Sequence, residues 1–331
     1  MSSWYKQLFR KDKAGSDTLL GISLNPNQAL WCLVRQTDQG PQITQTHALE
    51  QTFSSPGEAL KALCESAPVP TAPAHICLGH QYYNLLLVDA PDVPEAELRE
   101  AVRWKVKDLI TQPLEQVVMD VFRLPADAYR GRMNMSYVAV AERSQVQAVV
   151  DVCDQLSVNL RSISINELAM SGLAGQMSEL QERGAAFLYL NGQGGTINLI
   201  ENGSLYLTRT IELGNGGAVF SGNLDFQQDP VDNLALDVQR SLDYYESQIG
   251  KSGITALYLV SDAEEQNGWC PGLAERLPIA AQCFELSAGL QPTDGSAVAA
   301  GALAPALGVV LAALATAASG GTKAAGMGRV A

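Results

Sequence analysis

The sequence predicts an α/β fold of two similar lobes, with a small α+β subdomain inserted into the first. Its 331 residues are enough for two compact domains. Both halves of the chain open with a predicted strand hairpin around a polar loop, at Leu20–Val34 and Ala186–Ile211. Between them, residues 92–165 read helix, strand, strand, helix, strand, after a boundary marked by Pro91 and Pro94. The repeated hairpins predict the two lobes, and the intervening run predicts the insertion.

Composition and charge exclude several classes of function. Apolar residues make up 47% of the chain, so it can bury sizeable cores. The net charge is −13, and because an acidic chain of this size repels phosphate backbones, no nucleic-acid partner is expected. The six cysteines are scattered without a Cys-x-x-Cys pair, and there are only three histidines. This spacing predicts reduced thiols in a cytosolic protein and no metal site.

The first lobe is expected to cover residues 18–91 and 166–184. An apolar run at 18–24, the turn Asn25–Gln28 and a second run at 29–35 predict its opening hairpin. Its further elements are expected as strands at 42–53, 75–79 and 84–88 and as helices at 58–64 and 166–177.

The predicted insertion, residues 92–165, begins with an amphipathic helix at 95–110. Four apolar residues recur there at helical spacing: Leu98, Val102, Val106 and Leu109. Trp104 lies off this apolar stripe. An exposed tryptophan suits a contact with a partner protein, and packing against a neighbouring strand is the alternative. The other elements expected here are strands at 117–124, 135–141 and 159–165 and a helix at 144–156.

Residues 185–318 are expected to form the second lobe. Asn202-Gly203 is a strong hairpin-turn signal between two predicted strands. A strongly amphipathic helix is predicted at 234–249. The remaining elements are expected as strands at 185–190, 196–201, 205–211 and 257–260 and as a short helix at 271–277.

An uncharged, alanine-rich stretch closes the second lobe. Residues 295–322 carry no charge and are numerous enough to span a bilayer. Within them, 296–318 has few large aliphatic side chains and is interrupted by Pro305. A helix buried inside a soluble fold is therefore favoured over a membrane span. Residues 319–331 are rich in glycine and predict a disordered tail.

The N-terminal segment, residues 1–17, is basic and amphipathic. Its first 20 residues lack the apolar run of a signal peptide. Aromatic and cationic side chains alternate at helical spacing, which predicts contact with an anionic membrane surface through Trp4, Lys6, Phe9, Arg10 and Lys11. The alternative is a solvated tail.

Three segments carry a family resemblance. They are LALDVQRSLDYYESQ at 234–248, EAELREAVRWKV with QPLEQVVMD at 95–106 and 112–120, and PGLAERL at 271–277. In this order, they resemble the interlobe helix, the opening of the inserted subdomain and the helix after the second nucleotide-contact strand of PilM-type proteins, the actin-like components of the type IV pilus assembly platform. The resemblance covers about 18–310 and implies a bilobal actin-like (ribonuclease H-like) fold. The basic start and poor phosphate loops most resemble the MshI family of mannose-sensitive haemagglutinin (MSHA) pilus biogenesis.

The resemblance implies a location and a partner. Members of that family are cytoplasmic and sit on the inner membrane, where they bind the short cytoplasmic N-terminal segment of a PilN-type bitopic protein, called MshJ in the MSHA system. The partner segment lies between the first lobe and the inserted subdomain. In this chain the groove is therefore expected to involve residues of about 92–165.

The resemblance also locates a nucleotide site, but its chemistry is degenerate here. Ser23 stands where the family has the first metal-binding aspartate, and Asn25 where it has glycine. The second loop keeps its small residues but has no carboxylate before them: Gly192, Gly194, Gly195 and Thr196. The adenosine side is represented by Ser261, followed by an acidic run. We therefore expect a non-catalytic protein without a cofactor, with ATP implied by family resemblance only and Gly192–Gly195 serving as a plain hairpin loop.

Two other functions stay open on the sequence. One is an active or ATP-gated actin-like ATPase, against which the missing carboxylates argue. The other is the cytoplasmic part of a GspL-like type II secretion component, which shares the actin-like plan and continues into a transmembrane helix. In that case the alanine-rich end would have to span the membrane. The leading expectation is a non-catalytic actin-like scaffold of the pilus assembly platform.

Overall fold

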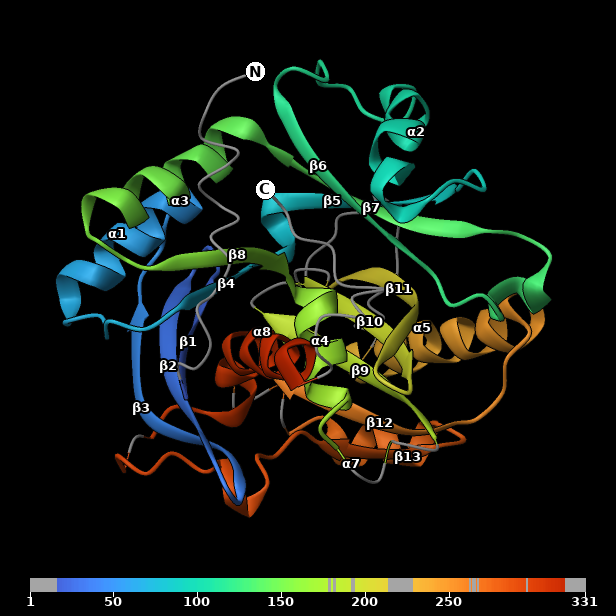
Figure 1. Cartoon of the computed structure of the whole chain (residues 1–331). Coiled ribbons are helices and arrows are strands. Elements are labelled where there is room, and N and C mark those ends of the chain that lie inside the picture. Colours follow the sequence, from blue (N-terminus) through green and yellow to red (C-terminus); the bar gives the residue numbers. More distant parts are fainter. Residues whose placement is uncertain are drawn as a thin grey trace, which may run out of the picture.

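The computed structural model of the chain describes residues 17–177, 180, 183–191, 194–213, 229–261, 263, 266, 268–295 and 297–318. The strands within these residues form two five-stranded sheets and one three-stranded sheet (Figure 1). The larger sheets belong to the two lobes and the smaller one to the insertion. The predicted two-lobed α/β fold with an inserted α+β subdomain is confirmed.

The first lobe is built on a sheet with the strand order β3-β2-β1-β4-β8. Its strands are β1 (Thr18–Leu24), β2 (Gln28–Thr37), β3 (Gly40–Glu50), β4 (Ala74–Leu78) and β8 (Leu160–Ile165). Helices α1 (Pro56–Ser66) and α3 (Arg143–Gln155) pack together on one face. α1 begins at Pro56, two residues before the expected start at 58, because the Ser55 side chain accepts a hydrogen bond from the Glu58 backbone N–H and Pro56 suits the first helical position.

The second lobe repeats this plan. Its sheet has the order β11-β10-β9-β12-β13, again with three antiparallel strands followed by two parallel ones. The strands are β9 (Gly184–Asn191), β10 (Gly194–Glu201), β11 (Ser204–Glu212), β12 (Ile254–Ser261) and β13 (Ala280–Cys283). Helix α5 (Pro230–Tyr244), continued by η5 (Tyr245–Ile249), packs with α7 (Cys270–Arg276). The predicted turn is confirmed, since Asn202 and Gly203 both have positive φ, at 52° and 69°.

Two helices lie between the lobes, α4 (Asn166–Ala174) and α8 (Ala300–Ala318). They pack against each other with their backbones in contact, because a Cβ added at Gly308 would collide with the carbonyl oxygen of Ala169. α8 is long and apolar enough to cross a membrane by length and composition, but most of it is buried among the strands and α4. The alanine-rich stretch is thus a core helix of the fold, and Pro305 lies inside it without ending it.

The insertion is a three-stranded sheet with a helix on one face. The strand order is β5 (Tyr83–Asp89), β7 (Met135–Glu142) and β6 (Val117–Arg123). Helix α2 (Glu95–Lys107) buries Leu98, Val102 and Val106 against one face of this sheet. The opposite face joins the main core, to which it contributes Tyr83, Tyr137 and other side chains.

The sheet pairing corrects two expected boundaries. β5 was expected in the first lobe, but it pairs with β7 of the insertion. β8 was expected in the insertion, but it pairs in parallel with β4 of the first lobe. The reason is that the apolar pattern of a short strand indicates burial and not its partner strand.

Three smaller expectations are also corrected or left aside. α2 ends at Lys107, so Leu109 lies beyond it and is 56% exposed and not part of the apolar stripe. Cys270 and Cys283 form a disulfide, because the start of α7 and the end of β13 lie side by side, whereas the other four cysteines are free. The predicted membrane-contact segment and C-terminal tail, residues 1–16 and 319–331, lie outside the described residues.

Candidate functional site

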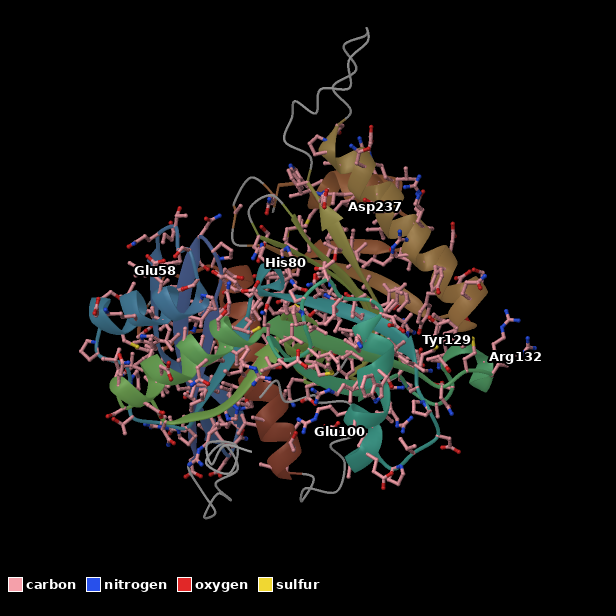
Figure 2. The ribbon with its side chains drawn as sticks, turned by 90° about the horizontal axis from the view of Figure 1, so that it is seen from above. Glu58, His80, Glu100, Tyr129, Arg132 and Asp237 are labelled. Carbon is pink, nitrogen blue, oxygen red and sulfur yellow. A yellow bond between two sulfur atoms is a disulfide. The ribbon has the colours of Figure 1, made fainter. Side chains whose placement is uncertain are left out.

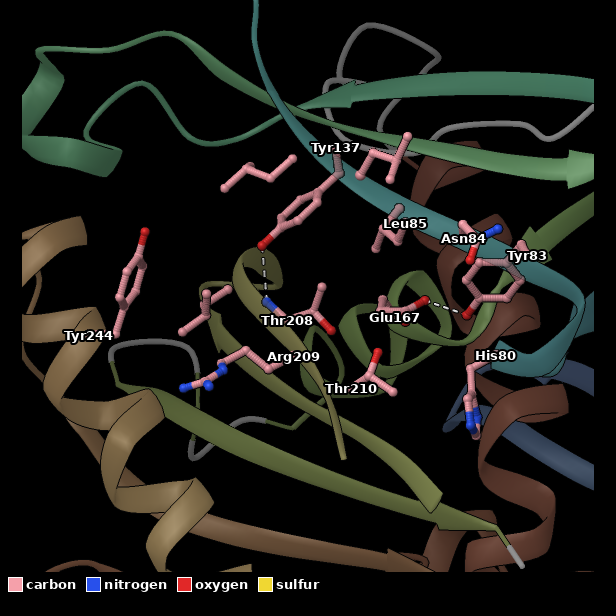
Figure 3. A pocket seen from close by; sticks show the side chains of 13 residues that line it. His80, Tyr83, Asn84, Leu85, Tyr137, Glu167, Thr208, Arg209, Thr210 and Tyr244 are labelled. Atoms are coloured by element: carbon pink, nitrogen blue, oxygen red, sulfur yellow. Dashed lines mark hydrogen bonds between the residues drawn. The ribbon is translucent and has the colours of Figure 1, made fainter. Parts of the chain in front are cut away.

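A cavity of about 650 Å³ lies between the insertion and the two lobes (Figure 3). We call it the three-way cleft. It is lined by residues of η2 (His80–Tyr82), β5, β7, α4, β11 and α5: His80, Tyr83, Asn84, Leu85, Leu86, Leu87, Tyr137, Glu167, Leu207, Thr208, Arg209, Thr210 and Tyr244. Of these, only Tyr137 falls within the expected groove region of 92–165, because β5 precedes that region and β11 belongs to the second lobe.

Two sheet edges face each other across this cleft. β5 is an edge strand of the insertion sheet, and β11 is an edge strand of the second-lobe sheet. An edge strand presents backbone N–H and C=O groups that an added extended segment can pair with. At one point the two sheets are joined directly, since the Thr208 N–H donates a hydrogen bond to the Tyr137 hydroxyl at 3.1 Å. The two sheets are therefore joined at the back of the cleft, and the edge strands β5 and β11 form its walls.

A buried carboxyl group lies at the inner wall of the three-way cleft. Glu167, in the first turn of α4, is only 2% exposed. Its Oε2 accepts a hydrogen bond from the Tyr83 hydroxyl at 2.5 Å, and that hydroxyl accepts one from the Asn166 N–H at 3.1 Å. Burial raises the pKa of Glu167, an effect that the hydrogen bond from Tyr83 partly offsets. Within the described chain, Glu167 has no ion-pair partner.

An unpaired cation lies on the opposite wall. Arg209 is exposed on β11, and Figure 3 shows its side chain extending toward Tyr244 of α5. Among the described residues it forms neither a hydrogen bond nor an ion pair. At the other end of the cleft His80 is half-buried, and this burial lowers its pKa to about 4, so it is neutral at physiological pH. The cleft thus has a cationic end and an end with a buried acid.

An ion cluster holds the insertion against the second lobe. Lys251, just after η5, lies 2.7 Å from Asp127 of the β6–β7 connection and 2.8 Å from Glu201 of β10. Tyr206 donates a hydrogen bond to the other Asp127 oxygen, and Tyr245 donates one to Glu201. The hydrogen bond from Lys251 lowers the pKa of Asp127. We call this cluster the clasp, because it holds the insertion against the second lobe, which carries β11.

The backbone next to the clasp is held in a strained conformation. Tyr129 and Arg130 of η3 (Ala128–Gly131) both have positive φ, at 53° and 57°, which costs about 1–2 kcal/mol for each residue with a side chain. The hydroxyls of Tyr129 and Tyr244 lie 3.3 Å apart, and Figure 2 shows Tyr129 and Arg132 beside the end of the long helix that carries Asp237. The contacts with α5 thus hold this connection in place.

The expected nucleotide site is filled by amide side chains. Asn25, after β1, and Asn191, at the end of β9, are buried and meet across the two lobes with 2.9 Å between Asn191 Nδ2 and Asn25 Oδ1. Gln81 donates a hydrogen bond to Asn191 Oδ1 at 2.9 Å, and Asn25 donates one to Ser23 at 3.2 Å. We call this set the amide bridge. Its donors and acceptors largely satisfy one another.

These residues do not fit Mg-ATP. A magnesium ion needs oxygen ligands, usually from carboxylates, and the phosphates need cations or free backbone N–H groups. Among the described residues, no carboxylate or cation is hydrogen-bonded to the amide bridge. No group of three metal-ligating acidic, histidine or cysteine side chains occurs anywhere in the described part of the chain.

The other residues expected at the nucleotide site are only partly brought together. Thr196 accepts hydrogen bonds from Asn166 and Asn198, at 3.4 and 3.0 Å, and is buried. Ser261, at the end of β12, donates to Gln266 at 2.6 Å and has no described hydrogen bond to the amide bridge. Gly194 and Gly195 are the first residues of β10, where they pair with Asn191 and Leu190 of β9. Gly192 lies outside the described residues.

Trp104, the expected partner contact, lies on the outer face of α2. It is 69% exposed, and the Lys107 ammonium group lies 5.6 Å from the centre of its ring. It does not line the three-way cleft. Of the five expected membrane-contact residues, Trp4, Lys6, Phe9, Arg10 and Lys11, none is among the described residues.

The residues that give the three-way cleft its polarity, Glu167 and Arg209, were not predicted from the sequence. Glu167 lies two residues after the predicted strand at 159–165 and directly precedes Leu168, Ala169 and Met170, so a carboxyl group stands at the start of an apolar run. That position was the available signal, because acidic side chains are rarely buried without a role. Arg209 gave no such signal, since a cation on an alternating strand is ordinarily a solvated one.

Comparison with known proteins identifies the fold. No family model matches the chain, and no curated protein matches it in sequence. It is similar to the solved structure described as "PilM-PilN type IV pilus biogenesis complex", with a TM-score of 0.68 and 18% identity over 89% of this chain and 98% of that one. A Bacteroides thetaiotaomicron protein "with actin-like ATPase fold and unknown function" is matched with a TM-score of 0.51 and 10% identity, over 88% and 96% of the two chains.

A third solved structure is the cytoplasmic domain of EpsL, an inner membrane component of the type II secretion system of Vibrio cholerae. It is matched with a TM-score of 0.49 and 13% identity over 90% of this chain and 95% of that one, which is too distant to support an argument. The first two likenesses show that this chain has the actin-like ATPase fold.

Proposed function

We propose that this chain is a non-catalytic actin-like scaffold of a type IV pilus assembly platform. In this role it binds the cytoplasmic N-terminal segment of a PilN-type bitopic membrane protein in the three-way cleft. The observation that carries the proposal is the cleft itself, a cavity of about 650 Å³ between the edge strands β5 and β11, in a fold similar to that of the PilM-PilN complex. A short extended segment fits such a place, because strand edges supply backbone hydrogen bonds and side pockets supply selectivity.

The walls of the cleft suit a segment with alternating side chains. Leu85 and Leu87 of β5 are half-buried, and Tyr137 is buried behind them, so apolar side chains of a partner can pack there. Thr208 and Thr210 of β11 and Asn84 of β5 add polar groups at the rim. An apolar floor with a polar rim is the usual composition of a peptide-binding site.

The scaffold role includes the absence of ATP turnover. The amide bridge occupies the meeting point of the two lobes with neutral groups, and hydrolysis needs a metal-bound phosphate and an oriented water. We therefore propose that partner binding in this protein needs no nucleotide.

The proposed setting is the cytoplasmic face of the inner membrane, where a bitopic partner would hold the chain. The finer assignment, to the MSHA system with an MshJ-type partner, rests on the sequence resemblance of the basic start and the degenerate loops. The N-terminal segment would add direct contact with anionic lipid.

The proposal is tested by filling the cleft. A fluorescent peptide with the N-terminal cytoplasmic sequence of the PilN-type protein from the same organism is titrated with the wild-type chain and with two variants. Thr210→Trp places a large side chain in the cleft from an exposed position on β11, and Gln45→Trp places the same side chain at an exposed position on β3. We expect Thr210→Trp to weaken binding at least tenfold and Gln45→Trp to leave it unchanged. Equal affinity of all three proteins, or no binding to the wild type, would contradict the proposal.

A further inference from the structure

We propose that the three-way cleft selects its segment by a basic side chain that pairs with Glu167, at the end of the cleft opposite Arg209. This inference rests on the proposed function and names the chemistry that the bound segment must carry.

The first step is that Glu167 has no cationic partner among the described residues of the free protein. A carboxyl group that is 2% exposed loses most of its hydration, and buried acids are almost always paired with a cation. Glu167 has one hydrogen-bond donor in Tyr83 and no cation within the described residues. An arrangement of this kind is costly to the free protein. A bound ligand that places a positive charge next to Glu167 would offset this cost.

The second step is that Glu167 borders the cleft and is not sealed behind it. It is one of the residues that line the cavity, together with Tyr83 and His80 at the same end (Figure 3). Its place in the first turn of α4 favours a carboxylate, because the positive end of the helix dipole is directed at it. The dipole of α4 would therefore stabilise the ionised carboxylate of Glu167 where it faces a bound ligand.

The third step identifies the ligand group as a basic side chain. A divalent metal ion is disfavoured because a single carboxylate is too few ligands, and no described cluster of metal-binding side chains exists here. The cavity that Glu167 borders also has apolar lining, including Leu85, Leu87 and the ring of Tyr137. Such walls suit the methylene stem of lysine or arginine, which covers apolar surface while its head meets a carboxylate.

The fourth step fixes the direction of the segment. Arg209 extends from the opposite wall toward Tyr244 and has no partner among the described residues. It repels a second cation, so the basic side chain of the segment is confined to the Glu167 end. The cavity is larger than one side chain, so the remainder of the segment continues along β5 and β11 toward Arg209.

The test is a double-mutant cycle between protein and peptide. The fluorescent partner peptide of the previous section is prepared with each lysine replaced in turn by norleucine and each arginine by citrulline. Each peptide is titrated with the wild type, with Glu167→Gln and with Glu212→Gln. Glutamine keeps the acceptor for Tyr83, and Glu212, exposed at the end of β11, provides the same loss of charge outside the cleft.

We expect one replacement to weaken binding to the wild type and to Glu212→Gln at least tenfold, which is about 1.4 kcal/mol, and to change binding to Glu167→Gln little. The other replacements should act equally on all three proteins. If every peptide replacement changes binding equally for all three proteins, Glu167 does not pair with a basic side chain of the peptide and the inference is wrong. The proposed function would then still stand. If the peptide does not bind the wild type, both are wrong. Should Glu167→Gln fold poorly, Glu167→Asp, which withdraws the carboxylate, must reduce the same coupling.

Discussion

Asn191 donates a hydrogen bond to Asn25 at 2.9 Å across the junction of the two lobes. In a nucleotide-binding actin-like protein the two loops that carry these residues cup the phosphates of one ligand. Here the protein's own amides join the loops, and Gln81 extends the link to η2, which leads directly into β5 of the three-way cleft. Hydrogen bonds between the protein's own side chains therefore link the junction of the two lobes to the three-way cleft.

The amide bridge should contribute measurably to stability. Asn191→Ala removes the central member and leaves the buried acceptor of Asn25 unpaired, whereas Gln81 is exposed and can turn to solvent. An unsatisfied buried polar group costs about 1–3 kcal/mol. We expect urea unfolding to show a loss of that size. Asn233→Ala, at an exposed position of α5, is the matched control and should change stability by less than about 0.5 kcal/mol. A loss no larger than the control's would show that the bridge is not a structural link.

Mg-ATP should not stabilise the protein. A ligand at a hundredfold excess over its Kd raises the free energy of unfolding by about 2.7 kcal/mol, which a thermal-shift assay detects readily. We expect no rise in Tm with millimolar Mg-ATP or Mg-ADP, and no phosphate release above background. An actin-like ATPase assayed in parallel provides the positive control. A saturable rise in Tm that Asn25→Asp or Asn191→Asp alters would show that the degenerate site still holds nucleotide.

The sequence was sufficient where a local signal fixes a local structure. Asn202-Gly203 predicted a hairpin turn, and both residues have the positive φ that this turn requires. Residues 296–318 have no charge and few large aliphatic side chains, which predicted a helix buried inside the fold. The contact of Gly308 with the Ala169 backbone is the reason for that composition.

The sequence was insufficient where the partner of an element decides its role. β5 reads like any buried strand, and its place beside β7 depends on a chain reversal of some fifty residues. The amide bridge needed Asn25, Gln81 and Asn191 to meet from three separate segments, and asparagine beside a glycine or proline is also the ordinary composition of a turn. The cleft could not be predicted from the sequence for the same reason, because its walls come from the insertion and from both lobes.

The clasp should hold the insertion on the second lobe. Lys251→Met leaves Asp127 and Glu201 close together with no cation between them, and hydrogen bonds to charged groups are worth about 1.5–3 kcal/mol. We expect faster hydrogen exchange in residues 127–134 and weaker partner binding, since β5 and β11 would no longer be fixed relative to each other. Lys61→Met removes an exposed ion pair of α1 and should have neither effect. Unchanged exchange in 127–134 would contradict the role given to the clasp.

The N-terminal segment should bind anionic membranes independently of the fold. Deleting residues 1–13 removes Lys6, Arg10, Lys11 and Lys13, partly offset by the loss of Asp12, and each basic residue near an anionic surface contributes about 1 kcal/mol. We expect the deleted protein to keep the Tm of the full chain and to lose sedimentation with phosphatidylserine vesicles. Neutral phosphatidylcholine vesicles are the control. If sedimentation with the anionic vesicles is unchanged by the deletion, the segment is a solvated tail.

Glu167 should cost stability in the free protein, in a way that depends on pH. Because burial raises its pKa in the folded state, the carboxyl group ionises more readily in the unfolded chain. Below its ordinary pKa it is protonated in both states and its ionisation costs nothing. As the pH rises above that value, ionisation favours unfolding, and each tenfold difference in the acid constant is worth about 1.4 kcal/mol.

Glu167→Gln removes this cost. We expect the variant to be more stable than the wild type at pH 7–8, and the difference to shrink toward zero near pH 4. The exposed control Glu212→Gln should differ from the wild type by an amount that hardly changes over this range. Urea unfolding at several pH values measures both. A Glu167→Gln variant that is less stable at pH 8 than at pH 4, relative to the wild type, would mean that the ionised carboxylate stabilises the fold. Its retention would then need no bound cation to account for it.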